Sequence, residues 1–126
     1  MLLSLPKNTE RLLWTEHAKS KMRFYGLTES RLKKVLRHPK RRETGVAPRT
    51  VAIMQPASIK VKDGQARWSQ EIWLMYQEMR LQKSGPKKTV VISAWRYPGV
   101  SRSGGAIPML EDIQRELNKI KKPAIS

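Results

Sequence analysis

Residues 87–97 read Lys-Lys-Thr-Val-Val-Ile-Ser-Ala-Trp-Arg-Tyr, and this stretch decides the fold class. Its centre, Thr-Val-Val-Ile at 89–92, is rich in β-branched residues and has no charged interruption, which favours a central strand. We therefore predict a strand from Lys87 to Trp95. The preceding Ser-Gly-Pro at 84–86 is typical of a turn, so a second strand is expected just before it.

The segment that would form this second strand is ambiguous. Residues 71–76 read Glu-Ile-Trp-Leu-Met-Tyr, which suits a buried strand. A helix also fits, because apolar residues recur at helical spacing over 71–79, namely Ile72, Met75, Tyr76 and Met79. We favour the strand, because the turn at 84–86 then joins the two segments as a hairpin.

Two short helices are predicted ahead of the sheet. After a short strand at 10–14, Thr15 is a suitable N-cap for a helix over 16–25, which Gly26 ends as a left-handed C-cap. A second helix begins at the cap Thr28 and stops before the His-Pro pair at 38–39. Its buried side is predicted to consist of Leu32, Val35 and Leu36.

The remaining segments predict further strands and one more helix. A strand covers Thr50–Met54, and turns are expected at Pro56 and at Asp63-Gly64. Residues 100–107 form a Ser/Gly/Arg loop that we expect to be mobile. A helix over about 108–121 begins with proline at its favoured first position, and its apolar stripe is Leu110, Ile113, Leu117 and Ile120.

These elements predict one α+β domain over residues 1–126, with its core at about 10–98. The expected order is two N-terminal helices, an antiparallel sheet and a C-terminal helix.

The charge of the chain points to an anionic partner. There are 26 Lys and Arg against 10 Asp and Glu, which gives a formal net charge of +16. Such a surplus repels itself, and nucleic acid is the commonest partner that neutralises it. Contact with nucleic acid or the ribosome is therefore our first expectation. The alternatives are a solvated cationic surface, a component of the translation apparatus and an anionic membrane surface.

Other classes are disfavoured by composition. The chain has no cysteine, which excludes disulfides, thiolate catalysis and cysteine-based zinc sites. Residues 1–6 are too short for a signal peptide, and no apolar run approaches the ~20 residues of a membrane-spanning helix. We expect a cytoplasmic protein that uses no membrane, metal or cofactor.

Basic residues are concentrated at the second predicted helix and in the segment after it. Glu29 and Glu43 flank this run without interrupting it, which favours a phosphate-tracking surface over a solvated helix face. Arg23 in the first helix and Arg102 in the late loop could add contacts to the nucleic-acid backbone. The residues of the run are Arg31, Lys33, Lys34, Arg37, Lys40, Arg41 and Arg42.

Chemistry, if present, is expected from His17 and from the end of the long strand. His17 lies among cations at a helix start, which favours a neutral imidazole that can act as a general base. A partly buried structural histidine is an equal alternative. Arg96 and Tyr97 are suited to hold a phosphate and to stack or exchange a proton. The alternative there is that Trp95 is core and Arg96 a solvated edge residue.

Two stretches resemble known families. Residues 14–23, Trp-Thr-Glu-His-Ala-Lys-Ser-Lys-Met-Arg, together with Gly-Leu-Thr at 26–28 and Leu-Arg-His-Pro at 36–39, resemble the opening of the domain-of-unknown-function family 4258. Residues 91–96, Val-Ile-Ser-Ala-Trp-Arg, resemble the Ile-Ser-Ala-Arg strand of BrnT-type toxins. Both groups are similar to the RelE/ParE superfamily, so the resemblance implies two helices packed on a twisted antiparallel sheet. Lys21 and Tyr25 stand where that family pattern has arginines.

The resemblance also implies a function. We expect a basic RNA-binding protein of toxin-like fold and consider metal-free endoribonuclease activity, with an antitoxin protein as partner. In that reaction His17 would be base or acid, Lys21 and Arg96 would hold the phosphate, and Tyr97 would stack or transfer a proton. The alternatives are a non-catalytic module that binds RNA, the ribosome or DNA, and a regulatory protein-interaction domain. The oligomeric state stays open.

Overall fold

The residues that the computed structural model describes are 5–45, 49–80, 82–102, 105–109 and 115. Within them the chain forms two helices and seven strands, which confirms the predicted α+β class. In chain order these are β1 (Leu12–Trp14), α1 (Glu16–Tyr25), α2 (Glu29–Arg37), β2 (Arg41–Thr44), β3 (Thr50–Pro56), β4 (Lys60–Lys62), β5 (Gln65–Arg67), β6 (Glu71–Met79) and β7 (Lys88–Tyr97).

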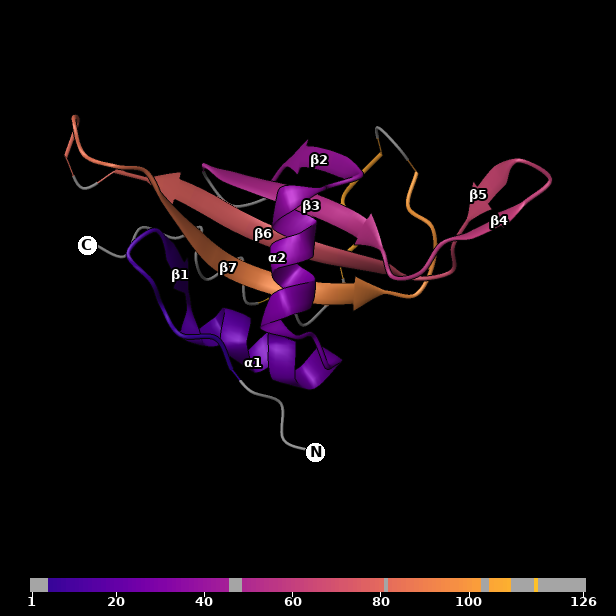
Figure 1. Ribbon diagram of the computed structural model, residues 1–126, viewed down its shortest axis with the longest axis horizontal. Helices are drawn as coiled ribbons and strands as arrows, with labels where there is room; N and C mark the ends of the chain where they lie inside the picture. Colours follow the sequence, from indigo (N-terminus) through magenta and orange to yellow (C-terminus); the bar gives the residue numbers. More distant parts are fainter. Residues whose placement is uncertain (1–4, 46–48, 81, 103–104, 110–114, 116–126) are drawn as a thin grey trace.

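Five strands form one mixed sheet in the order β1-β7-β6-β3-β2, and β4 and β5 form a separate hairpin (Figure 1). The antiparallel pair of β6 and β7 confirms the predicted hairpin and settles the ambiguous segment 71–79 as a strand. β7 lies between β1 and β6, as expected for a strand with an uninterrupted apolar centre.

The expectation of a purely antiparallel sheet is wrong at β1, which runs parallel to β7. β1 pairs only with residues 89–91, and the chain then enters α1. α1 then runs alongside the remaining residues of β7. The Arg96 Nε in β7 donates to the Tyr25 carbonyl at the end of α1 over 2.8 Å. The helix thus covers the edge that β1 leaves unpaired, and a parallel β1 leads into it without a reversal of the chain (Figure 1).

The helix boundaries follow the predicted capping signals. The Thr15 Oγ1 accepts a hydrogen bond from the Ala18 backbone N–H over 3.0 Å, and the Thr28 Oγ1 accepts one from the Arg31 N–H over 3.1 Å. Each bond satisfies a donor that the first helical turn leaves without an intrahelical partner. Gly26 ends α1 with φ of 66°, a left-handed conformation that strains residues with a Cβ.

Two of the predicted connecting segments differ from expectation. The basic segment after α2 is largely strand, because β2 already begins at Arg41. Pro56 is the last residue of β3 and pairs with Glu71, so the predicted turn at this position is wrong. The turn at Asp63-Gly64 is confirmed: both residues have positive φ, 52° and 75°, as a two-residue hairpin turn between β4 and β5 requires.

One face of the sheet packs against the two helices, and α2 crosses in front of it (Figure 1). Leu32 of α2 and Met22 of α1 are fully buried in this core. Leu36, predicted to be buried with Leu32, packs at its margin and is partly exposed. The strands contribute Ile53, Ile72, Leu74, Tyr76, Val91 and Ala94.

The opposite face is covered by the chain that follows β7. Trp73 and Trp95 stack there with parallel rings, 6.1 Å between centroids, and Ile107 and Met109 pack against their cluster. The Trp95 Nε1 donates to the Pro108 carbonyl over 2.7 Å. Trp95 is therefore core and does not offer a stacking surface.

The segment 100–107, which the sequence predicts to be mobile, is anchored to the sheet in its described residues. The Arg41 guanidinium donates to the Ser101 Oγ and to the Gly105 carbonyl, both over 2.7 Å. The predicted C-terminal helix at 108–121 lies outside the described residues, apart from Pro108, Met109 and Arg115.

Replacing Leu32 by alanine tests which side of α2 is buried. Leu32 is 0% exposed, and removing a fully packed leucine side chain costs about 2–5 kcal/mol of unfolding free energy. Phe24→Ala is the control, because Phe24 is 72% exposed and its loss should change stability by less than about 0.5 kcal/mol. Urea unfolding measures both values, and equal losses would contradict the described packing.

Candidate nucleic-acid interface

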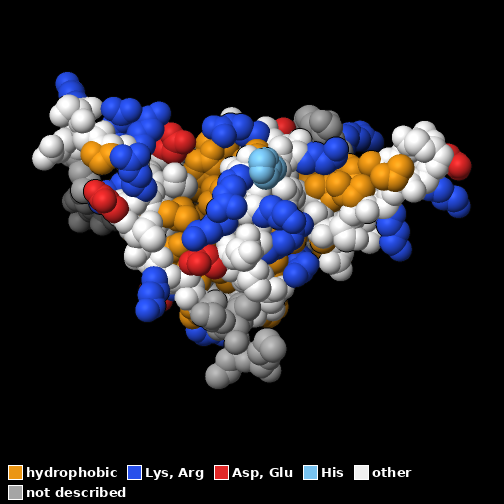
Figure 2. Space-filling view, viewed as in Figure 1, with side chains coloured by type: hydrophobic (Ala, Val, Ile, Leu, Met, Phe, Trp, Pro, Cys, Tyr) orange, Lys and Arg blue, Asp and Glu red, His pale blue; other side chains and the backbone are white. Residues whose placement is uncertain are grey.

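The amphipathic pattern of α2 presents its cations outward. Leu32 and Val35 point into the core, whereas Lys34 and Arg37 lie on the other side of the helix and are exposed to solvent. Figure 2 shows Lys and Arg side chains gathered over α2 and around a histidine. The burial of one face of α2 thus concentrates charge on the other.

A groove of about 450 Å³ runs between α2 and the end of β3, and we name it the α2 groove. None of the described residues that line it is acidic. Its lining consists of Arg31, Lys34, His38, Lys40, Gln55, Pro56, Ala57, Ser58 and Ile59. The groove therefore brings together Arg31 and Lys34 of α2 with Lys40 of the segment that leads to β2, which are three of the seven residues in the predicted basic run.

Arg31 occupies the inner side of this groove. Its guanidinium donates to the Gln55 Oε1, to the Pro56 carbonyl over 2.8 Å and to the Ala57 carbonyl over 3.4 Å. All three acceptors are neutral, so its positive charge is not cancelled. Burial, and then the positive charge of Arg96, lower the pKa of Arg31 below its ordinary value. An anion in the groove would raise this pKa through its attraction to the guanidinium and so offset both effects.

Gln55 explains why the groove keeps its shape. Its side-chain Nε2 donates to the His38 carbonyl over 2.8 Å and to the Lys34 carbonyl over 3.4 Å. These are carbonyls at the end of α2, which have no partner within the helix. One β3 side chain therefore holds both Arg31 and the last turn of α2.

The cations of α2 differ in how well they are neutralised. The Lys33 Nζ lies 3.6 Å from the Oε2 of Glu29, one helical turn earlier, and both side chains are partly exposed to solvent. Lys34 and Lys40 have no ion pair with any residue of the described ranges. The net charge at the groove therefore comes mainly from Arg31, Lys34 and Lys40.

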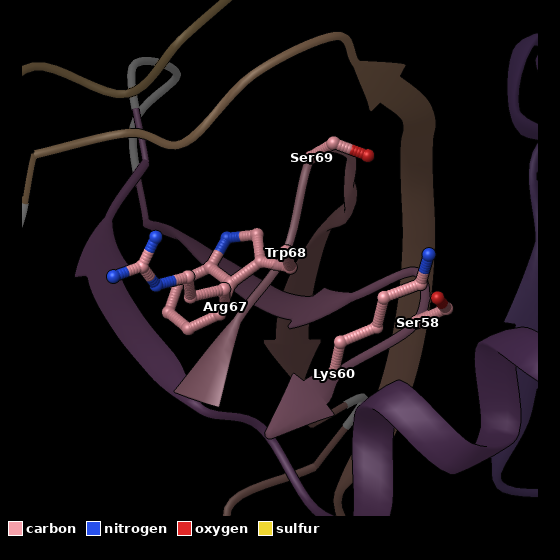
Figure 3. A pocket seen from close by; sticks show the side chains of 5 residues that line it. All are labelled: Ser58, Lys60, Arg67, Trp68 and Ser69. Atoms are coloured by element: carbon pink, nitrogen blue, oxygen red, sulfur yellow. The ribbon is translucent and has the colours of Figure 1, made fainter. Parts of the chain in front are cut away.

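A second cleft, of about 250 Å³, lies at the base of the β4–β5 hairpin, and we name it the Trp68 cleft (Figure 3). It shares Ser58 with the α2 groove, and the Lys40 ammonium lies 5.3 Å from the centre of the Trp68 ring. The two depressions therefore adjoin. The Trp68 cleft is lined by Ser58, Lys60, Arg67, Trp68 and Ser69.

Glu71 anchors the Trp68 side chain from inside the molecule. Its carboxylate is 0% exposed and accepts hydrogen bonds from the Trp68 Nε1 (2.9 Å), the Trp73 Nε1 (3.1 Å) and the Ser101 backbone N–H (3.0 Å). Burial alone would raise the pKa of Glu71, but the hydrogen bonds from Ser101, Trp68 and Trp73 together lower it below 4.5. The group is therefore a buried carboxylate stabilised by neutral donors.

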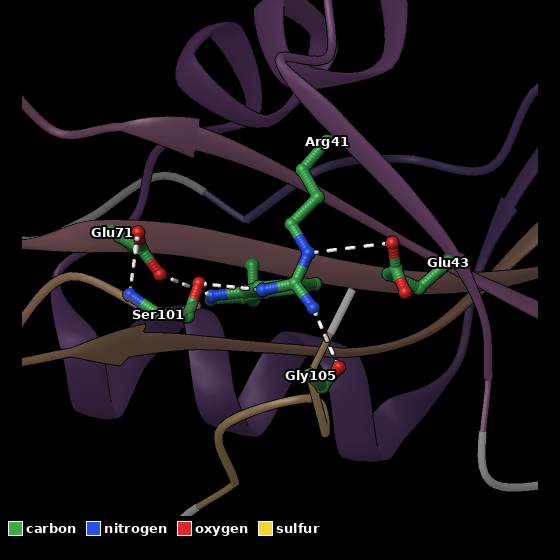
Figure 4. Close-up of polar contacts among 6 residues, drawn as sticks. Arg41, Glu43, Glu71, Ser101 and Gly105 are labelled. Atoms are coloured by element: carbon green, nitrogen blue, oxygen red, sulfur yellow. Dashed lines mark hydrogen bonds and ion pairs between the residues drawn. The ribbon is translucent and has the colours of Figure 1, made fainter. Parts of the chain in front are cut away.

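Arg41, predicted to bind nucleic acid, lies on the opposite side of the sheet from the α2 groove (Figure 4). It is 8% exposed, lies 5.2 Å from the Trp73 ring and forms an ion pair with Glu43 at 3.4 Å. Neighbouring residues of a strand point to opposite faces, so Arg42 points away from Arg41 and donates to the Tyr76 hydroxyl over 2.8 Å. Neither arginine lines the α2 groove.

The four predicted catalytic residues do not converge on one point. The His17 Nε2 lies 2.9 Å from the Ser93 Oγ, and Lys21 follows one helical turn later. Arg96 instead binds the carbonyl of Tyr25, and eight residues of helix, about 12 Å, separate that position from His17. Tyr97 packs against the tryptophan cluster on the opposite face of the sheet.

The other predicted nucleic-acid contacts are dispersed. Arg23 is exposed in the last turn of α1, and Arg102 is exposed in the segment after β7. Neither of them lines the two depressions. Among the residues that the structure describes, no group of three His, Asp or Glu side chains could hold a metal ion. No helix in the described part is long and apolar enough to cross a membrane.

Several residues of this surface were not predicted. Gln55, Ser58, Lys60, Arg67 and Trp68 form parts of the two depressions. The position of Trp68 on the surface could have been inferred from the sequence, because it stands between Arg67 and Ser69, outside every apolar periodic run. A large aromatic residue in such a polar, basic context is typical of a surface site.

Glu71→Gln should lower stability in a pH-dependent way. A glutamine side chain keeps one acceptor but brings an NH₂ against the donors, which should cost about 1–3 kcal/mol at pH 7. The folded-state pKa of Glu71 is lowered, so its stabilising contribution is complete above about pH 4.5 and is lost as the pH falls below that value. Urea unfolding over a pH series should therefore show wild type and variant converging in acid. A constant difference at all pH values would contradict this assignment.

In comparisons with known proteins, no protein-family model, no curated protein and no solved structure matches this chain. The resemblance to the toxin families stays a prediction, and the function is argued from the geometry of the surface.

Proposed function

We propose that this protein binds RNA, with the phosphate backbone lying in the α2 groove. The observation that carries the proposal is that Arg31, Lys34 and Lys40 meet in one groove without a carboxylate partner among the described residues. Each phosphate that such cations neutralise releases condensed counterions and adds affinity that does not depend on sequence.

The energetics of the fold support an anionic ligand at this place. Arg31 and Arg96 repel each other, and both guanidiniums hydrogen-bond to neutral acceptors. A phosphate in the α2 groove would replace part of this repulsion by attraction. The groove is preformed, because Gln55 holds Arg31 and the end of α2 together, so little ordering is needed on binding.

RNA is preferred over DNA for two reasons. The exposed Ser58 hydroxyl lies where the two depressions adjoin, and a hydroxyl can bond the ribose 2′-OH that distinguishes RNA. The resemblance of residues 14–39 to a toxin-like family also favours RNA. DNA binding through the same phosphate contacts is the alternative, and parallel titrations with RNA and DNA of one sequence separate the two.

The double variant Lys34→Gln/Lys40→Gln tests the α2 groove. Loss of two phosphate contacts should reduce the slope of log K against log salt for single-stranded RNA by about 1.4. The matched control is Lys33→Gln/Lys87→Gln, which removes the same charge from lysines paired with Glu29 and Glu78. Fluorescence anisotropy at several salt concentrations measures the slopes. Equal effects of the two variants would show that only net charge matters and would refute a groove.

A second candidate function is metal-free RNA cleavage at His17, and the His17–Ser93 contact favours it. This contact fixes the ring of a partly exposed histidine at the start of α1, with Lys21 on the same helical side. A histidine held in this way can transfer a proton to or from a ribose hydroxyl. Because Arg96 is bound at the other end of α1, positive charge for the transition state would come from Lys21.

His17→Ala tests this second candidate. Cleavage of RNA in the presence of EDTA should fall by roughly 10²–10⁴ in rate, because a general acid–base group is lost. RNA affinity should stay nearly unchanged, because an imidazole adds little to phosphate binding. Gel analysis of labelled RNA measures cleavage. Wild-type protein that binds RNA without cutting it, or cleavage that survives the substitution, rejects this candidate and leaves the binding function standing.

A further inference from the structure

Trp68 differs from the other tryptophans of the chain. The sequence has four, and Trp14, Trp73 and Trp95 are buried with at most 3% exposure. Trp68 is only half-buried and lines an open cleft at the base of a projecting hairpin. Part of the apolar indole surface is therefore exposed to water, which is unfavourable. A planar ligand stacked on the ring would bury this surface.

The ring is held in a fixed orientation. Its Nε1 donates to the buried Glu71 carboxylate, which is itself bound by Trp73 and Ser101. A platform that is already oriented loses little conformational freedom when a ligand stacks on it. Trp68 is therefore fixed in orientation, as a surface for stacking a base requires, unlike a side chain that is free to rotate.

The surroundings of the ring fit an anionic, planar ligand. Figure 3 shows Arg67 beside the indole, and the Lys60 ammonium with Ser58 on the opposite side of the cleft. Lys40 lies 5.3 Å from the ring centre and links the Trp68 cleft to the α2 groove. Cations thus stand on the sides from which the phosphates flanking a stacked base would approach.

The size of the Trp68 cleft limits what it can hold. Its volume, about 250 Å³, is below the roughly 300–1,000 Å³ of pockets that enclose a drug-sized ligand. A single nucleobase with its ribose edge fits this space better than a complete dinucleotide cofactor. A chain of nucleotides can continue from it into the adjoining α2 groove.

We propose that the Trp68 cleft binds one unpaired nucleobase, stacked on Trp68, of a strand whose backbone continues into the α2 groove. This inference rests on the proposed function and narrows the ligand to single-stranded nucleic acid. A base within a duplex is stacked and paired on both sides, so it cannot reach the ring unless it is flipped out.

Two variants of one residue isolate the contribution of stacking. Trp68→Phe and Trp68→Leu both lose the hydrogen bond to Glu71, but only phenylalanine keeps an aromatic face. The probes are a short oligoadenylate, which has bases, and a linear polyphosphate of matched charge, which has none. Thermal melts of both variants verify that they fold alike, and binding of the polyphosphate reports the contacts of the cations without any contribution from a base.

Trp68→Leu should weaken oligoadenylate binding roughly 5- to 150-fold, whereas Trp68→Phe should retain most of the affinity. Polyphosphate binding should be the same in both variants. Oligoadenylate should also quench tryptophan emission in the wild type, and the quenching should vanish in Trp68→Phe because the other three indoles are buried.

Failure of the base site and failure of the proposed function give different results. Equal oligoadenylate affinity of Trp68→Phe and Trp68→Leu, with polyphosphate still bound, would overturn the base site and leave the α2 groove intact. Equal sensitivity of duplex and single-stranded RNA to Trp68→Leu would overturn it too. If neither probe binds to the wild type in a salt-dependent way, the proposed function fails and the base site fails with it.

Discussion

The buried carboxylate of Glu71 joins three parts of the molecule that are distant in the sequence. It accepts hydrogen bonds from the root of the β4–β5 hairpin, from the centre of the sheet and from the segment that follows β7. A carboxylate without solvent contact is tolerated only when donors surround it, so these three parts have to come together for the chain to fold. Because its donors are neutral, Glu71 cancels no surface charge directly. The same hydrogen bonds thus orient the Trp68 ring and hold the segment after β7 over the tryptophan cluster.

The two faces of the sheet consequently have different properties. One face is covered by the described residues that follow β7, 100–102 and 105–109, with Arg41 buried among Trp73, Ser101 and Gly105. The other is covered by α2, whose outward surface carries the α2 groove and its unpaired cations. With a net charge of +16, self-repulsion costs stability wherever the charge is placed. Three of these cations, Arg31, Lys34 and Lys40, lie together in a preformed groove, which is why we propose an anionic ligand there. In the same proposal, the adjoining Trp68 cleft distinguishes a nucleic acid from a simple polyanion.

Local signals predicted much of the fold. The caps Thr15, Gly26 and Thr28 act within one helical turn, so the bounds of both helices could be read from neighbouring residues. The turn at 84–86 likewise identified β6 as a strand. The parallel pairing of β1 could not be predicted in this way, because it depends on α1 lying along β7. The position of Arg41 is also a long-range property: whether it or Arg42 points toward the helices is decided by the register of β2 with β3. The charge pattern pointed to α2, whose cations line the α2 groove, but did not reveal Gln55 or Trp68, because their positions arise from contacts across the fold.

The most direct test of this account is a map of the residues that respond to single-stranded RNA, obtained by titrating the ¹⁵N-labelled protein and following its backbone and indole NMR signals. The account predicts that the largest shifts fall on α2 from Arg31 onward, on the end of β3 and on the Trp68 indole, with Arg41, Trp95 and residues 105–109 unaffected. Shifts concentrated on the face of the sheet that carries Arg41 and Trp95, or spread evenly over all exposed cations, would contradict it.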